Sequence, residues 1–350
     1  MISKVKESKD SIYDLSLIEL VGFVDSVGEK AFRAGQIFKW IYEKGAQSFS
    51  AMQNLPQELR NKLSEKFSFS SINMSGQQVS VDGTIKLLFE LNDGEKIETV
   101  IIPTSKRLTL CVSTQAGCKY GCKFCASGIG GLKRNLSCAE IISQILYAKN
   151  IMLARQKSCG LSHIVFMGVG EPLDNYDNLL KAVRIINAKE GLGIAARKIT
   201  VSTCGLIEGI KKLSKEGLQV ELAISLHGYN DKTRDILMPV NKKYPIKELI
   251  KVAKEYIRTT KRQITFEYIL IKDLTFSEDA ARELAKMFRG MICKMNLIFY
   301  NEVPEFDFKA VSRAEGENFK KDLKYYGVHA TIRTPRGKDV LAACGQLRHK

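Results

Sequence analysis

The sequence predicts an α/β fold: a partial (β/α)6 barrel with a small N-terminal helical accessory domain and a β-hairpin connection. From about residue 104 onward, six apolar segments typical of strands alternate with amphipathic segments of helical length. The 350 residues suffice for a barrel of roughly 200 to 250 residues plus a smaller appendage. Six units are too few to close an eightfold barrel, so we expect an open one.

Residues 1–70 are expected to form the helical domain. Apolar residues recur there at spacings of three and four, as Phe32, Ile37 and Ile41 illustrate, and this spacing is typical of one helix face. Pro56 opens the last of these helices. The resulting small domain precedes the hairpin connection.

The connection is expected to span residues 71–103. Residues 86–91 and 98–102 have the composition of strands, and Asn92-Asp93-Gly94 between them is a hairpin turn signal. Residues 104–350 then form the barrel and a C-terminal extension that carries Cys344.

The expected barrel strands are rich in Val, Ile, Leu and Thr and occupy residues 108–114, 162–168, 198–204, 220–227, 263–271 and 294–300. Ser137 and Glu140 have the spacing of a capping box at the start of the first barrel helix. The active site of such a barrel lies at the carboxyl ends of its strands.

Polar residues and glycines collect at these predicted strand ends. They are Gly168, Gly170 and Glu171 at the end of the second strand, Ser202 at the end of the third, Ser225 and His227 on either side of Leu226 at the end of the fourth, and Asn301 at the end of the sixth. Packing alone does not explain such a collection, so we expect one ligand pocket there.

Cys118, Cys122 and Cys125 follow the first strand with the spacing C-x3-C-x2-C. A closed structural metal site needs four ligands, whereas a cubane iron–sulfur cluster held by three thiolates leaves one iron open for a small molecule. The alternative is a zinc site completed by Cys111, although structural zinc sites usually pair two separated C-x2-C knuckles.

The three cysteines, with Phe124 before the last of them, resemble the signature of the radical S-adenosylmethionine (SAM) enzymes. The resemblance implies a [4Fe-4S] cluster whose fourth iron binds SAM. Gly170 and Glu171 match the Gly-Gly-Glu-Pro motif of these enzymes, which implies that Glu171 faces the SAM ammonium. The further SAM contacts implied are Ser202, Ser225, Leu226, His227 and Asn301. Taken alone, His227 is more often a structural histidine.

Sequences outside the cysteine loop narrow the resemblance. Four segments closely resemble the RlmN branch of the RlmN/Cfr family. They are residues 32–42, residues 109–115 around Cys111, residues 237–241, and residues 342–347 around Cys344. This branch methylates carbon 2 of adenine in 23S rRNA, at the peptidyl-transferase centre, and in tRNA. Methylation of carbon 8, as in the Cfr branch, is the alternative.

The resemblance also implies a mechanism that uses two SAM molecules per turnover. Cys344 would carry a methyl group and become linked covalently to the RNA, Glu98 would accept the carbon-2 proton, and Cys111 would release the product by forming a disulfide with Cys344. A low-potential electron donor such as flavodoxin and a thiol reductant would be needed. Without the resemblance, Glu98 is a strand-edge charge and a free cysteine is a small buried hydrophobe.

The formal net charge of +16 indicates a polyanionic partner, and nucleic acid is the first candidate; solubility alone is the alternative. Four basic residues surround the cysteines and could steer phosphates toward them: Lys119, Lys123, Lys133 and Arg134.

The nine cysteines, unevenly spaced and odd in number, favour a reducing compartment over a disulfide scaffold. No stretch reaches the roughly 18 apolar residues of a membrane span, and the first ten residues carry charges where a signal peptide would need an apolar stretch. We therefore expect a cytoplasmic protein without membrane contact. We also expect a monomer. Cys138, Cys159 and Cys293 are expected to be structural. An electron-transfer protein and a zinc-stabilised RNA-binding module remain alternatives from other classes.

Overall fold

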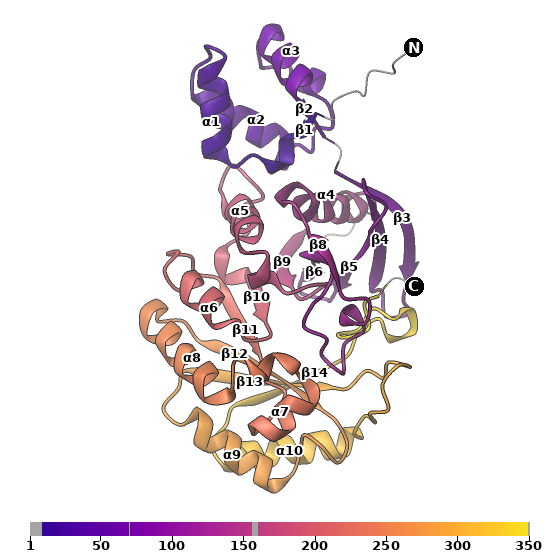
Figure 1. Ribbon diagram of the computed structural model, residues 1–350. Coiled ribbons are helices and arrows are strands. Elements are labelled where there is room, and N and C mark those ends of the chain that lie inside the picture. Colours follow the sequence, from indigo (N-terminus) through magenta and orange to yellow (C-terminus); the bar gives the residue numbers. More distant parts are fainter. Residues whose placement is uncertain (1–8, 70, 156–159, 349–350) are drawn as a thin grey trace.

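The computed structural model describes residues 9–69, 71–155 and 160–348, so Cys159 lies outside the described residues. The first part of the chain forms three helices, α1 (Leu17–Ser26), α2 (Phe32–Tyr42) and α3 (Gln57–Lys66), and a short parallel pair of strands, β1 (Asp10–Ser11) and β2 (Phe67–Ser68). In Figure 1 this indigo group sits at one end of the molecule, above α4 and α5.

Local sequence explains these helices. Ser16 and Glu19 form a capping box that satisfies the first amides of α1. The predicted apolar face of α2 buries Ile37 and Ile41, whereas Phe32 at its first turn is 55% exposed. Pro56 immediately precedes α3, as predicted.

One ten-stranded sheet dominates the rest of the chain, in the order β14-β13-β12-β11-β10-β9-β6-β5-β4-β3. Its antiparallel part consists of β3 (Ile72–Val79), β4 (Ile85–Leu91) and β5 (Lys96–Pro103), and β5 pairs antiparallel with β6. Its parallel part consists of β6 (Leu108–Cys111), β9 (Leu161–Phe166), β10 (Ile199–Thr203), β11 (Glu221–Ser225), β12 (Ile264–Leu270), β13 (Cys293–Phe299) and β14 (Ala330–Arg333). The sheet does not close, which confirms the open barrel.

A helix follows each of the six predicted barrel strands, and two follow β11. They are α4 (Cys138–Ala154), α5 (Tyr176–Asn187), α6 (Ile207–Leu213), α7 (Asp231–Leu237), α8 (Ile246–Thr260), α9 (Glu278–Phe288) and α10 (Arg313–Tyr325). Short 3-10 helices lie at Ile12–Asp14, Phe49–Ala51, Ala126–Gly128, Pro172–Asp174, Ala196–Lys198, Pro239–Lys242 and Lys338–Val340. The capping box of Ser137 and Glu140 at α4 is present as predicted.

The sequence reasoning missed three features of the sheets. Strand β3 is mostly exposed at the sheet edge, and β14 is only four residues long, so neither carries a clear apolar pattern. A separate two-stranded sheet, β7 (Gln115–Gly117) with β8 (Leu132–Asn135), brackets the cysteine loop. This small sheet fixes both ends of the loop.

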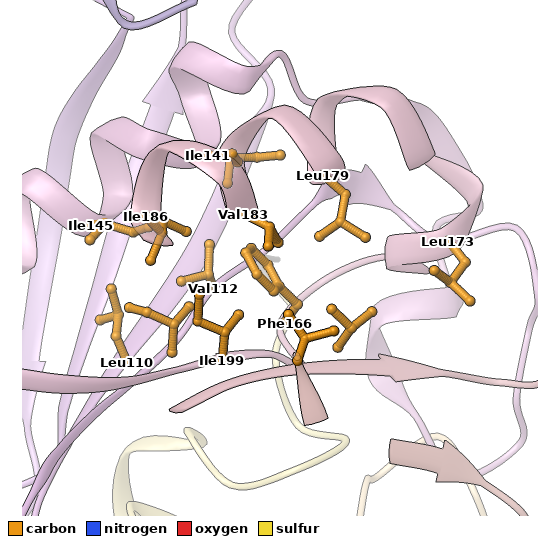
Figure 2. Packing of buried hydrophobic residues seen from close by; sticks show 14 of the residues in the cluster. Leu110, Val112, Ile141, Ile145, Phe166, Leu173, Leu179, Val183, Ile186 and Ile199 are labelled. Atoms are coloured by element: carbon orange, nitrogen blue, oxygen red, sulfur yellow. The ribbon is translucent and has the colours of Figure 1, made fainter. Parts of the chain in front are cut away.

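The core that supports the site lies between the sheet and its outer helices. Figure 2 shows Phe166 of β9 next to Val183 of α5 and Leu110 of β6 near Ile145 of α4. All four side chains are at most 2% exposed. Because such interiors are close-packed, these contacts fix the positions of the strands, and therefore of the strand ends that form the site.

The N-terminal helices are joined to the barrel by polar contacts. The Asp14 carboxylate accepts a hydrogen bond from the backbone amide of Ala139 (2.7 Å) in the first turn of α4, where the helix dipole favours a negative charge. Lys181 of α5 donates to the carbonyl of Asp14 and forms an ion pair with Glu19. The two parts therefore share one interface. Among the described residues, no helix is both long and apolar enough to cross a membrane.

Two leucine substitutions test the importance of this core. Leu110→Ala removes a fully buried side chain and should lower the free energy of unfolding by about 3–5 kcal/mol, because it leaves a cavity. Leu153→Ala, at a position on α4 that is 65% exposed, should change it by no more than about 0.5 kcal/mol. Urea unfolding followed by circular dichroism measures both; similar effects would contradict the assignment of the core.

Candidate functional site

A cavity of about 160 Å³ lies at the carboxyl ends of the parallel strands. The three clustered cysteines line it, and the strand ends opposite contribute Gly168, Gly170, Glu171, Ser202, Ser225 and His227. The structure therefore brings most of the predicted site residues together on one face. Leu226 and Asn301 do not line this cavity.

Cys118, Cys122 and Cys125 occupy the loop between β7 and β8. Burial raises the pKa of the Cys118 thiol to about 12, and it raises the pKa of Cys122 and Cys125 as well, with a further contribution from the neighbouring cysteines. A thiolate is costly in this setting unless a cation compensates its charge. The three thiols thus fit a metal centre that supplies positive charge, as the iron of a [4Fe-4S] cluster does.

Cys111, the fourth ligand that the zinc alternative proposed, does not lie at the cavity of the three cysteines. It lies in a small apolar cluster with Val100, Val169, Ala342 and Leu347. In the described part of the chain, no three His, Cys, Asp or Glu side chains are grouped as ligands of a single metal ion. The donor set therefore fits a cluster of several irons better than one zinc ion.

The fully buried Arg234 of α7 connects the strand ends beside the site through hydrogen bonds. Its guanidinium donates five hydrogen bonds, to the carbonyls of Cys204, Ser225, Leu226 and Tyr244 and to Oδ1 of Asn241. Its positive charge also opposes the rise in the pKa of Cys122. Arg234 therefore holds two strand ends together and places a cation near the cysteine loop.

The two glycines after β9 pack closely against the chain that follows β6. A Cβ on Gly168 would lie 2.7 Å from the backbone nitrogen of Ser113, and one on Gly170 would lie 2.5 Å from Cβ of Gln115. Gly170 also has φ +104°, which L side chains rarely adopt. The glycines line the cavity, but it is close packing against the chain after β6 that requires them.

Glu171 is buried, and its carboxylate accepts hydrogen bonds from the amides of Leu173 (3.0 Å) and Cys204 (2.7 Å). Burial raises its pKa, and these two bonds oppose the rise. Side-chain hydrogen bonds from Cys204 and Thr203 also oppose the rise. Glu171 thus anchors two loops at the wall of the cavity.

His227 is held as a neutral ring. Its Nδ1 accepts a hydrogen bond from the amide of Ile269 (3.1 Å), so the proton resides on Nε2, and its ring packs edge-on against Phe124 (centroids 4.7 Å apart). Burial lowers its pKa to about 3. The strained φ of +53° at this residue indicates that the surrounding contacts impose its position.

Two of the predicted SAM contacts lie elsewhere. The Leu226 side chain is fully buried in the hydrophobic core, because its strand position points away from the cavity, so only its backbone could contact a ligand. Asn301 donates from Nδ2 to the carbonyl of Cys344 (3.0 Å) and lines a second cavity, described below.

The exposed Cys344 lines the cavity of the three cysteines, and the amide of Ala126 anchors the next residue by donating to the carbonyl of Gly345 (2.7 Å). Cys111 packs against two neighbours of Cys344, Ala342 and Leu347. Burial, followed by the nearby charge of Cys344, raises the pKa of Cys111 to about 12. The structure thus brings together two cysteines that are more than 200 residues apart in sequence.

Glu98 lies on β5, two residues before Val100, which is paired with Cys111 across the sheet. Its carboxylate forms a buried ion pair with Lys86 (3.2 Å). It lines a neighbouring cavity of about 580 Å³, from which Cys344 is absent. Residues 341–348 contribute to both cavities: Leu341, Gln346 and Arg348 line that of Glu98, whereas Cys344 and Gly345 line that of the three cysteines.

The basic patch around the cysteines is only partly free. Arg134 pairs with Glu140 through two hydrogen bonds and also with Asp93, and Lys119 pairs with Asp174 (2.6 Å). Lys123 and Lys133 are exposed. The charges of Arg134 and Lys119 are thus partly compensated within the protein, and the steering of phosphates by the four residues stays a prediction.

Sequence reasoning missed two charged residues of the site. Glu267 of β12 and Arg333 at the end of β14 both line the cavity. Glu267 interrupts an otherwise apolar, fully buried strand, which was a usable signal. No sequence signal indicated Arg333, because its strand, β14, has no clear apolar pattern.

Comparisons with known proteins agree with this geometry. Residues 11–68 match the model of the ribosomal RNA large subunit methyltransferase N-terminal domain, and residues 112–285 match the radical SAM superfamily. A protein of Bacillus thuringiensis (strain Al Hakam) is described as "Probable dual-specificity RNA methyltransferase RlmN". It is 45% identical over 99% of this chain and 95% of its own length.

A relative with the same description from Bacillus cereus (strain B4264) is 46% identical over 98% of this chain and 94% of its own. The crystal structure of a radical SAM methyltransferase from Sphaerobacter thermophilus superimposes with a TM-score of 0.92 at 42% identity. It covers 97% of this chain and 99% of that one.

The geometry of the two cysteines leads to a labelling prediction. At pH 8 iodoacetamide should modify the exposed Cys344 well before Cys111, because a pKa of about 12 leaves only about one Cys111 in ten thousand as thiolate. Raising the pH toward 11 should accelerate Cys111 labelling about tenfold per pH unit. Peptide mass spectrometry of the metal-free protein measures both rates; Cys111 reacting first would contradict the buried position.

Proposed function

Because the chain belongs to the RlmN family of radical SAM RNA methyltransferases, we propose that it methylates carbon 2 of adenine in 23S rRNA, at the peptidyl-transferase centre, and in tRNA. The observation that supports this most directly is the position of Cys344. Its thiol lines the same cavity as the three clustered cysteines, and Cys111 packs against its neighbours.

Carbon 2 of adenine has no lone pair with which to attack the methyl group of SAM, so the reaction needs another route. Cys118, Cys122 and Cys125 would hold the [4Fe-4S] cluster, with SAM placed against Glu171, Ser202, Ser225 and His227. When bound, these groups supply methyl transfer and one-electron cleavage of SAM. We propose two SAM molecules per turnover and a low-potential electron donor.

Cys344 would act as the methyl carrier. Its exposed thiol loses a proton and takes the methyl group by nucleophilic displacement, which turns Cys344 into a thioether. After loss of one hydrogen atom, the methylene carbon attached to Cys344 bonds to carbon 2 and tethers the RNA to the protein. The hydrogen bond from Asn301 to the Cys344 carbonyl holds the backbone of the carrier during these steps.

Glu98 would then accept the carbon-2 proton, and the adduct would give up its unpaired electron to the bound cluster, so that a closed-shell thioether remains. The β5–β6 register supports this role, because it places Glu98 near the partner of Cys111. Since Glu98 and Cys344 line different cavities, this step requires a movement that lets both face the bound base.

Cys111 would complete the cycle. Its thiolate attacks the sulfur of Cys344, the bond from that sulfur to the methylene carbon breaks, and the carbon takes a proton to become the methyl group of the product. A Cys111–Cys344 disulfide remains, and a thiol reductant resets it. We propose that the enzyme acts as a cytoplasmic monomer. Its N-terminal helices would contact the RNA, and the net charge of +16 favours binding to phosphates.

Nucleoside analysis tests the reaction. Anaerobically reconstituted protein, with SAM and a low-potential reductant, should produce 2-methyladenosine in 23S rRNA and tRNA, detected by mass spectrometry. Cys118→Ala, which removes one cluster ligand, should produce at least a thousandfold less, because the remaining residues cannot supply the radical chemistry. Formation of 8-methyladenosine instead would assign the enzyme to the Cfr branch, and no methyladenosine from cluster-loaded protein would overturn the proposal.

The two cysteines should fail at different steps. Cys111→Ala should accept the methyl group and accumulate a covalent protein–RNA species, because nothing attacks the sulfur of Cys344. Cys344→Ala should form neither methylcysteine nor the adduct. Denaturing gel electrophoresis with labelled RNA and intact-protein mass spectrometry measure these outcomes. An active Cys344→Ala variant would exclude the methyl carrier role.

A further inference from the structure

The site cavity meets a second, larger cavity at Cys344. The second cavity, of about 490 Å³, occupies the interior of the open barrel between the inward-facing residues of its strands. Five residues line both cavities: Met167, Glu267, Ile298, Arg333 and Cys344. A molecule in the barrel interior would therefore meet Cys344 at this junction.

Glu267 places a buried acceptor at the junction. Its side chain is 4% exposed, and Oε1 accepts a hydrogen bond from Nδ2 of Asn296 (3.0 Å). Asn296 is fixed in turn by the hydroxyl of Thr331, which donates to its Oδ1 (2.6 Å). Oε2 of Glu267 is equally buried and has no hydrogen-bond partner among the described residues. A buried carboxylate oxygen without a donor is costly, so this atom indicates a ligand donor.

Arg333 places a cation at the same junction. Its Nη1 contacts the sulfur of Met167 (3.6 Å), and its charge interacts with those of Cys344 and Glu267. Yet within the described residues Arg333 and Glu267 do not form an ion pair. Two opposite charges that line one space without touching leave room for a group that offers a donor to Glu267 and an acceptor to Arg333.

We propose that Glu267 and Arg333 bind the Watson–Crick edge of the target adenine, an inference that rests on the proposed carbon-2 methylation. The 6-amino group of adenine donates to Oε2 of Glu267, and N1 accepts from the Arg333 guanidinium. Carbon 2 is bonded to N1, so this orientation directs carbon 2 toward Cys344, which lines the same junction as Arg333. The pair therefore selects adenine and orients it.

The other end of the barrel interior suits an RNA substrate. The cavity extends to the amino ends of the strands, where Arg107 and Lys294 line it. Arg107 is exposed and Lys294 is half-buried. Because phosphates bind such cations, the nucleotides next to an inserted adenosine have compensating charges at this mouth.

The amino and carboxylate groups of SAM carry the same pair of charges, so the experiment must separate SAM from adenine. Glu267→Met removes the acceptor at similar volume, and Glu267→Gln keeps one acceptor oxygen. Methylation of Cys344 in the absence of RNA, measured by intact-protein mass spectrometry, reports SAM binding alone. It should persist in both variants; its loss together with weaker SAM binding would assign the pair to SAM and overturn the proposal.

Recognition of the 6-amino group is measured with RNA hairpins that carry adenosine or purine riboside at the target position. The preference is the ratio of kcat/KM for the adenosine hairpin to kcat/KM for the purine riboside hairpin. This ratio should be about 10- to 100-fold larger for the wild-type enzyme than for Glu267→Met. The intrinsic reactivity of the two bases cancels in this comparison. Glu267→Gln should restore part of the preference, which loss of folding cannot explain. An unchanged preference in Glu267→Met would overturn the proposal.

Recognition of N1 uses the same design with 1-deazaadenosine, and 7-deazaadenosine serves as the matched control. The wild-type enzyme should bind the 1-deaza hairpin about tenfold more weakly than the 7-deaza hairpin, and Arg333→Met should abolish this difference. If binding depends on N7 instead, the protein contacts the Hoogsteen edge and not the Watson–Crick edge, and the assignment is overturned. Glu221→Gln, which alters a carboxylate of the same cavity that pairs with Arg262, should retain both preferences.

If the wild-type enzyme methylates neither adenosine nor any analogue, the proposed function fails. If it methylates adenosine with a preference that no longer depends on Glu267 or Arg333, only this inference fails.

Discussion

The site depends on the buried guanidinium of Arg234. By donating to the carbonyls of Cys204 and Ser225, it holds the ends of β10 and β11 at a fixed separation, and by its own position it fixes α7 beneath them. The end of α7 then supports the cysteine loop, because the carbonyl of Leu237 accepts the amide of Lys123 (2.9 Å). One cation thus connects the wall of the cavity to the loop of the three cysteines. A buried charge of this kind is tolerated only because its hydrogen bonds are satisfied.

The C-terminal segment is the second element on which the site depends. It crosses from β14 to the cysteine loop, where the Ser127 hydroxyl donates to the carbonyl of Leu347 (2.8 Å) and the Ala126 amide donates to Gly345. These contacts hold Cys344 beside the cavity without enclosing its side chain, which stays exposed. The proposed role as methyl carrier needs this combination, because Cys344 would meet SAM, the RNA base and Cys111 in turn.

The open barrel explains why a large substrate can be used. A closed eightfold barrel fills its interior with side chains, whereas this open sheet leaves a cavity between the inward-facing residues of its strands. The antiparallel strands β3, β4 and β5 extend the sheet beyond the cysteine loop and bring Glu98 and Lys86 close to the C-terminal segment. The extension therefore provides groups that a minimal barrel would lack.

The sequence by itself determined the cysteine loop, the six strand–helix units and the polar strand ends, because each depends on spacing within one short segment. The same locality explains the capping boxes and the first turn of α3. Only the tertiary structure decided that Arg134 pairs with Glu140 and Asp93, that Glu98 and Cys344 line different cavities, and that Gly168 packs against Ser113. It also decided that Glu267 and Arg333 share a cavity with Cys344. These relations join residues distant in the chain or depend on which side of a strand faces inward, and no local pattern records them.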